Sequence, residues 1–194
     1  MGKAKQRTLI TIFVMSTIAV LVILLYYYLV NRPEVNDDEP TELEVLINKD
    51  LELYYPATPK EVVKLFSNIL QNLYTELDED EYNALSLKIR ELYDEELLEI
   101  NPLDKNLNLL GNEIIEWQDA KRRIVKISYV NEKDNRSRVE DGVEYHTINV
   151  AYTFEEKSKF IENYSFILRK DENKRWKILG WKYLPESDNG KDGD

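Results

Sequence analysis

An uncharged run of 23 residues, from Thr8 to Val30, most constrains what this 194-residue chain can fold into. At about 1.5 Å of rise per residue, a helix of this length spans the roughly 30 Å hydrocarbon core of a bilayer. A buried core helix and a cleaved signal peptide are the alternatives. The apolar part of a signal peptide has only about 7–15 residues and ends at small residues. This run ends instead in the tyrosines of residues 26–28, which are typical of a membrane interface. We therefore predict an uncleaved signal-anchor.

The charges on either side of the run predict how it is oriented. Three basic residues precede it (Lys3, Lys5 and Arg7), whereas acids dominate the segment that follows. The positive-inside rule then places the N-terminus in the cytoplasm and the rest of the chain outside, as in a single-pass protein of the cell membrane. The predicted lipid contacts are Thr8, Leu9, Ile10, Phe13, Val14, Leu21, Leu24, Tyr26, Tyr27, Tyr28 and Val30.

Composition limits the classes of partner. The formal charge of the chain is −11, and residues 31–194 hold 23 basic and 37 acidic side chains, a net charge of −14. Such a negative surface repels nucleic acid, so we expect no nucleic-acid partner. The chain has no cysteine and one histidine. We therefore predict no disulfide, no metal site and no bound cofactor.

The region after the run begins with acidic and proline residues, which indicate a stalk over 31–53. A weak apolar patch at 43–47 fits a short turn or strand. Thr58 and Glu61 then form a capping box, and Pro59 suits the first position of a helix. Apolar residues recur at helical spacing after this box, after Asp78 with Glu81, and over 103–117. These three helical stripes contain Val62, Leu65, Phe66, Ile69, Leu73 and Leu77; Tyr82, Leu85, Ile89, Leu92 and Tyr93; and Leu103, Leu107, Leu110, Ile114 and Trp117.

The second half changes to the period-two pattern of strands. The segments 122–130, 143–154, 159–170 and 175–184 predict four antiparallel strands, with residues 131–142 as a polar connection. The expected inward residues are Val125, Ile127 and Tyr129; Ile148, Val150, Tyr152 and Phe154; and Phe160, Tyr164, Phe166 and Leu168. Amphipathic helices must cover the apolar face of such a sheet. The predicted fold class is therefore α+β, with about three helices packed on a curved four-stranded antiparallel sheet.

The predicted organisation is a cytoplasmic N-terminus (1–7), a transmembrane helix (8–30), a stalk (31–53), an extracytoplasmic α+β domain (54–185) and a disordered tail (186–194). The order of elements and the last strand, with Trp176, Lys177 and Ile178, resemble the nuclear transport factor 2-like superfamily. The segments 58–66 and 92–102 are similar to those of an uncharacterised family of single-pass membrane proteins from Firmicutes, a domain of unknown function. The first resemblance implies a cone-shaped domain, and the second implies no known activity.

Few residues are candidates for chemistry. His146 shares strand parity with Ile148 and Val150, so it is a pocket candidate, although a polar residue at a strand end explains it as well. Trp176 and Trp181 are candidates for a partner surface. Their opposite parity on one strand predicts that at least one leaves the core face, unless a bulge intervenes. No catalytic constellation is present, so we predict no catalytic residue.

The expected function is a membrane-anchored extracytoplasmic interaction or ligand-binding module, such as a scaffold or assembly subunit with a protein partner at the cell envelope. The alternative is a small-molecule-binding or enzymatic use of the cone, as in the isomerase and dehydratase members of the superfamily. A deep apolar pocket that contains an acid or His146 would favour the alternative. A cone filled by aromatic side chains would favour the interaction module.

Overall fold

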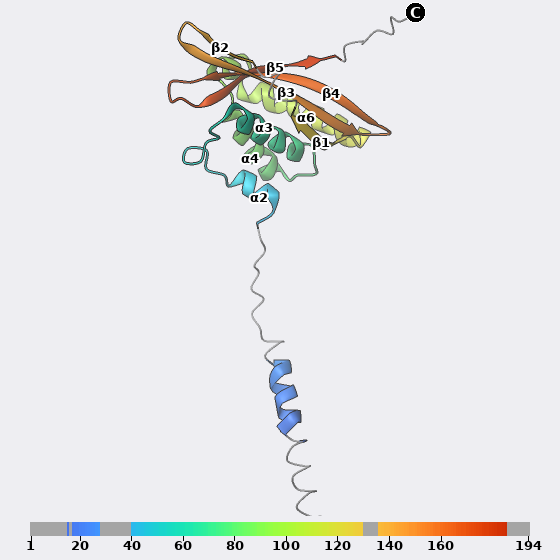
Figure 1. Ribbon diagram of the computed structural model, residues 1–194. Helices are drawn as coiled ribbons and strands as arrows, with labels where there is room; N and C mark the ends of the chain where they lie inside the picture. The colour runs from blue at the N-terminus through green and yellow to red at the C-terminus, as the bar shows by residue number, and fades with distance from the viewer. Residues whose placement is uncertain (1–14, 16, 28–39, 130–135, 186–194) are drawn as a thin grey trace, which may run out of the picture. The chain divides into compact units, whose positions relative to one another are not determined.

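The computed structural model of the chain describes residues 15, 17–27, 40–129 and 136–185 (Figure 1). The chain divides into two compact units, Met1–Glu39 and Pro40–Asp194. Residues 17–27 of the first unit are helical and exposed. Among the described residues, no helix combines the length and the apolar character needed to cross a bilayer. The predicted segments 1–7 and 186–194, and both ends of the predicted span 8–30, lie outside the described residues.

The second unit is an α+β domain whose helices lie on one face of an antiparallel sheet (Figure 1). This confirms the predicted fold class in its coarse form. The helices are α2 (Glu42–Ile47), α3 (Pro59–Leu73), α4 (Glu79–Arg90), α5 (Glu95–Ile100) and α6 (Leu103–Ala120). The strands are β1 (Arg123–Tyr129), β2 (Ser137–Glu140), β3 (Val143–Glu155), β4 (Lys159–Lys170) and β5 (Trp176–Leu184).

The predicted helix starts are confirmed by their capping geometry. Thr58 Oγ1 accepts a hydrogen bond from the backbone of Glu61 at 3.2 Å, and the Glu61 carboxylate accepts one from the backbone of Thr58 at 3.1 Å. Asp78 and Glu81 form the same reciprocal pair at the start of α4. Each pair satisfies backbone N–H groups that the first helical turn leaves without partners.

Helix α2 was not predicted as a helix. A third capping box, between Thr41 and Glu44, starts it, and the expected turn or strand at residues 43–47 is wrong for this reason. Leu46 of α2 and Leu51 after it are 5% and 3% exposed, because both side chains belong to the main core. The compact unit therefore starts at Pro40, and the boundary predicted between residues 53 and 54 falls inside it.

The sheet has one strand more than predicted. Its order is β1-β3-β4-β5, and β2 also pairs with β3. β1 pairs with residues 150–155 of β3 and β2 with residues 143–146, so both lie along the edge of β3 opposite β4. Asp141 and Gly142, with φ of 50° and 81°, form the two-residue turn between β2 and β3. Positive φ at both positions is typical of a type I′ hairpin, so β2 extends into the expected polar connection.

Two bulges change the predicted strand faces. In β1 the register shifts between Ile124 and Lys126, so Ile124 is 5% exposed while Val125, predicted to face inward, is only half-buried. In β5, Ile178 pairs with Leu168 and Gly180 pairs with the adjacent Ile167 of β4. Leu179 is therefore an extra residue without a partner in β4. A bulge of this kind reverses the parity of the strand beyond it.

The core lies between α3 and the sheet. Val62, Val63 and Ile69 of α3 are fully buried, as is Val150 of β3. The predicted inward face of β3 is confirmed, because Ile148, Tyr152 and Phe154 are also buried. All of these residues belong to one hydrophobic cluster that reaches from Leu46 to Ile178.

The membership of α2 in the folded unit can be tested by truncating adjacent side chains. We expect Leu46→Ala to lower the free energy of unfolding by about 2–4 kcal/mol, because it leaves a cavity in the core. Val45→Ala removes a side chain that is 52% exposed and should change stability by less than about 0.5 kcal/mol. Chemical denaturation of both variants measures the difference. Equal stability of the two would mean that the folded unit starts after α2.

Candidate functional site

A cavity of about 460 Å³ lies between the helices and the concave face of the sheet. Its walls come from both layers of the domain: α3, α4, α5 and α6 on one side and β1, β3, β4 and β5 on the other. The lining is mostly apolar and aromatic, as is typical of small-molecule sites. It includes Phe66, Leu70, Tyr74, Tyr93, Leu97, Ile100, Leu109, Leu110, Trp117, Tyr152, Phe154, Tyr164, Phe166 and Trp181.

Aromatic side chains form two groups in the wall of the cavity, one around Tyr74 and Trp117 and one around Trp181. Tyr74 stacks on Trp117 with ring centres 3.6 Å apart, and Trp117 meets Phe154 edge-on at 5.2 Å. At the β5 side, Trp181 lies 5.3 Å from the ring of Phe66 and 5.8 Å from that of Phe166. Contacts between aromatic rings stabilise the domain beyond their burial, so both groups are defined surfaces.

One charged side chain lines the cavity, the carboxylate of Glu113 on α6. The Tyr74 hydroxyl donates a hydrogen bond to its Oε1 at 2.8 Å. Burial of the phenol, together with the nearby Glu113 charge, raises the pKa of Tyr74 well above its ordinary value. Tyr74 therefore stays a neutral donor at physiological pH. The other polar groups of the lining are neutral: the amides of Asn101 and Asn106 and the hydroxyls of Tyr93, Tyr152 and Tyr164.

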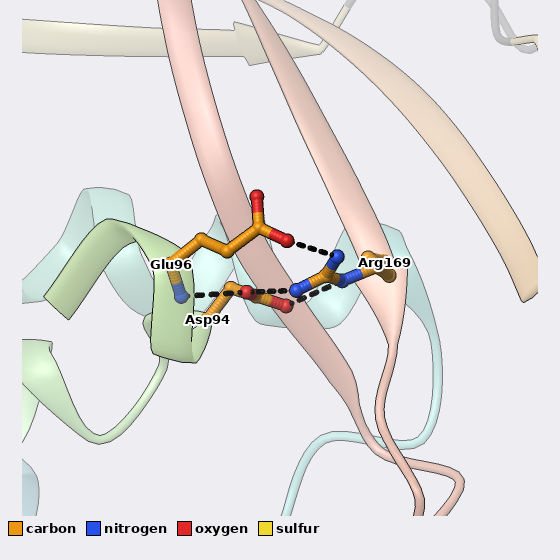
Figure 2. Close-up of polar contacts among 3 residues, drawn as sticks. All are labelled: Asp94, Glu96 and Arg169. Atoms are coloured by element: carbon orange, nitrogen blue, oxygen red, sulfur yellow. Dashed lines mark hydrogen bonds and ion pairs between the residues drawn. The ribbon is translucent and has the colours of Figure 1, made fainter. Parts of the chain in front are cut away.

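An ion pair fixes the helical wall of the cavity (Figure 2). Asp94, the N-cap of α5, is 4% exposed at its side chain, and its two carboxylate oxygens bind the Arg169 guanidinium of β4. Arg169 Nη1 also lies 2.6 Å from Glu96 Oε1, and Asp94 Oδ1 accepts from the backbone N–H of Glu96 at 3.1 Å. The pairing with both acids raises the pKa of Arg169 further above its ordinary value. Arg169 is thus permanently charged and is bound to two carboxylates at the start of α5.

The same segment adds a bridge to the edge of the sheet. The backbone N–H of Asp94 donates to the carbonyl of Ile178 at 2.9 Å, and the N–H of Ile178 donates to the carbonyl of Leu92 at 2.8 Å. Tyr93, between these bonds, is paired with Ile178 as an isolated parallel bridge. Because Tyr93 and Leu97 both line the cavity, the contacts of Asp94 determine the position of this wall.

A second, larger cavity of about 780 Å³ lies beside the turn between β4 and β5, and charged residues dominate its lining. Two of its cations already have partners within the protein. Lys177 Nζ donates to the carbonyl of Glu91 at 2.6 Å, and Arg175 donates to the carbonyl of Glu52 at 2.8 Å. Both cations also lie over the Tyr55 ring. The arrangement is that of a satisfied polar surface, so the apolar cavity is the candidate site.

The structure places the predicted site residues as follows. His146 does not line the apolar cavity; it is half-buried, its Nδ1 lies 2.7 Å from Ser137 Oγ, and its ring meets Trp176 at 6.0 Å. Partial burial lowers the pKa of His146 below its ordinary value. Trp176 is 9% exposed, whereas Trp181 is 42% exposed and lines the cavity. Of the predicted anchor residues, the structure describes Leu21, Leu24, Tyr26 and Tyr27, and all four are exposed.

The bulge at Leu179 explains why both tryptophans contact the helical side of the sheet. Trp181 is the cross-strand partner of Phe166, and Ile178 that of Leu168, so all four share one face.

Within the residues that the structure describes, no group of three or more His, Asp or Glu side chains could hold a metal ion.

Sequence reasoning missed Glu113. A signal was present, because Glu113 lies three residues after Leu110 and four before Trp117, at the edge of the apolar stripe of α6. An acid at the edge of a stripe is ordinarily solvated. Only the position of Tyr74, 39 residues earlier, makes this one part of a cavity.

The comparisons with known proteins give one result. A family model described as "Domain of unknown function (DUF6715)" matches residues 1–181. The resemblance to an uncharacterised family is confirmed to this extent. No curated protein matches the sequence.

The ion pair at the cavity wall predicts a large effect on stability. Arg169→Leu leaves the buried Asp94 carboxylate without its partner, so we expect a loss of about 3 kcal/mol in the free energy of unfolding. Arg138→Leu is the matched control, because Arg138 is 63% exposed and lies 3.5 Å from Glu140 on the same sheet. Exposed pairs contribute less than about 1 kcal/mol. Denaturation curves that show equal losses for the two variants would contradict the structural role of Asp94 and Arg169.

Proposed function

The chain belongs to the family described as a domain of unknown function (DUF6715), and we propose that it is a membrane-anchored extracytoplasmic ligand-binding module. In this proposal the folded unit has the cone arrangement of the nuclear transport factor 2-like superfamily. The open side of the cone is the apolar cavity, and the ligand is a small molecule with a large apolar part.

The observation that carries the proposal is the cavity itself. Its volume of about 460 Å³ lies within the roughly 300–1,000 Å³ that is typical of ligand sites. Aromatic walls with one acid and a few amides have the composition of such sites, in which apolar surface gives affinity and a few polar groups orient the ligand. The cavity is apolar and has an acid in its lining, which supports the small-molecule-binding alternative drawn from the sequence.

Binding is favoured over catalysis by the state of that acid. Isomerase and dehydratase chemistry needs a base in a water-excluded position, within hydrogen-bond reach of the proton that it removes. Glu113 is exposed and already accepts a hydrogen bond from Tyr74. His146 lies away from this lining. The groups of the cavity are therefore suited to orienting a ligand more than to transforming it.

A second candidate is a scaffold that takes an apolar segment of a protein partner at the cell envelope. The exposed apolar side chains at the cavity favour it. Ile100 and Leu109 are 70% and 58% exposed, and both line the cavity together with Trp181. Exposed apolar residues that gather around a concavity are typical of interaction sites.

The first test uses N-phenyl-1-naphthylamine, a neutral apolar dye that fluoresces in apolar sites, and the full chain in lipid nanodiscs. We expect saturable binding at one site per chain after subtraction of empty nanodiscs. Leu110→Trp adds bulk to the lining and should weaken binding about ten-fold, which corresponds to about 1.4 kcal/mol. Leu87→Trp, at a 51% exposed position of α4 outside the lining, should leave binding unchanged.

Binding that is not saturable, or equal in the two tryptophan variants, would contradict the ligand-binding proposal. The scaffold candidate would then be tested with a photo-crosslinking residue at position 109. Recovery of one stoichiometric partner would support it, and crosslinks to no protein would contradict it.

The anchored and extracytoplasmic parts of the proposal rest on the uncharged run, the tyrosines that end it and the basic residues before it. Residues 17–27 also expose apolar side chains along a helix, as a lipid-facing segment would. An alkaline phosphatase fused after Asp194 should be active, because this enzyme works only after export. Replacing Lys3, Lys5 and Arg7 with Glu should reduce that activity. An inactive alkaline phosphatase fusion, together with an active cytoplasmic reporter at the same position, would contradict the orientation.

A further inference from the structure

The carboxylate of Glu113 gives the cavity a negative charge. Among the described residues it is the only charged one in the lining, and it stands on α6 one turn from both Leu110 and Trp117. Glu113 is exposed, so water screens part of its charge, but the apolar walls beside it concentrate its field toward the cavity. The charged part of a ligand in this cavity is therefore selected by a carboxylate.

The Glu113 carboxylate is held in one orientation and can still accept further hydrogen bonds. Tyr74, which is 8% exposed, donates to Oε1 and thereby holds the side chain against the Tyr74–Trp117 stack. An ionised carboxylate accepts several hydrogen bonds through its two oxygens. Within the part of the chain that the structure describes, Glu113 has no ion-pair partner. The remaining acceptor positions are available to a cationic donor.

The neighbouring cation does not neutralise Glu113. The Arg122 guanidinium lies 5.3 Å from the centre of the Trp117 ring, but it is bound to Glu156 at 3.0 Å. The Trp117 ring is already covered by Tyr74 and lies under Arg122, so the attraction for a ligand cation comes from the Glu113 carboxylate itself. An anionic head group would be repelled by the same carboxylate.

We propose that the cavity binds small amphiphiles with a cationic head group, an ammonium or a guanidinium, which pairs with Glu113 while the apolar body lies against Leu110, Phe166 and Trp181. This inference rests on the proposed ligand-binding function and names the chemical class of ligand. The charge on Glu113 gives specificity, and the apolar wall gives most of the affinity.

The test compares three ligands with the same chain length and different head groups: octylammonium, octanol and octanoate. Each is titrated below its micellar concentration to displace N-phenyl-1-naphthylamine from the full chain in nanodiscs of uncharged lipid. We expect octylammonium to displace the dye at about five-fold lower concentration than octanol, and octanoate to be the weakest. Glu113→Gln should abolish the advantage of octylammonium over octanol and leave displacement by octanol unchanged.

Glu116→Gln is the matched control, because Glu116 is exposed on the same helix and does not line the cavity. It removes the same charge and should retain the preference for octylammonium. The amide of Glu113→Gln can still accept from Tyr74, and thermal unfolding verifies that both variants are folded.

The outcomes separate the two claims. Equal displacement by all three ligands in the wild-type chain would overturn the cationic class while leaving the ligand-binding module in place. Equal loss of the preference in both Gln variants would overturn the role of Glu113, because general negative charge would then explain it. Failure of the dye to bind would remove the ligand-binding module and this inference together.

Discussion

The arrangement of the domain depends on one buried carboxylate. Asp94 accepts from the backbone at the start of α5, binds Arg169 of β4, and donates its own backbone N–H to Ile178 of β5. A buried carboxylate is tolerated only where hydrogen bonds and a cation compensate for its loss of water. The junction of α4 and α5 must therefore pack on the sheet where Arg169 can bind Asp94. Tyr93 precedes Asp94 in the chain and Leu97 follows it. The position of Asp94 therefore also fixes where these two side chains line the cavity.

The cavity follows from the unequal way in which α3 and α6 cover the sheet. Seven residues of α3 are buried, whereas Ile114 is the single buried residue that the structure shows in the eighteen of α6. A helix that contributes so little to the core leaves room between its apolar stripe and the strands. The bulge at Leu179 turns Trp181 into that room instead of away from it. The open side of the domain is therefore the α6 side.

The parts of this fold that periodicity controls were predictable, and the parts that depend on single residues were not. Capping boxes and apolar stripes predicted α3, α4 and α6 because these signals are local. The bulges at Val125 and Leu179 leave no local signal, since both residues continue an apolar strand. β2 had a signal in the Asp141–Gly142 pair, which favours a two-residue hairpin, but its four residues are all exposed and show no alternation. Glu113 became part of a site only through Tyr74, a contact between distant segments.

The apolar surface of α5 and α6 gives the strongest reason to assign a function to the open side. Single exposed apolar residues are common on folded proteins and need no explanation. Here Ile100, Leu109 and Trp181 come from three different elements and line one cavity, although folding stability gains little from side chains that are 42–70% exposed. Since their burial does not stabilise the free domain, the contact that would bury them is with another molecule. In the proposed function, the carboxylate of Glu113 in the same lining selects a cationic head group on that molecule.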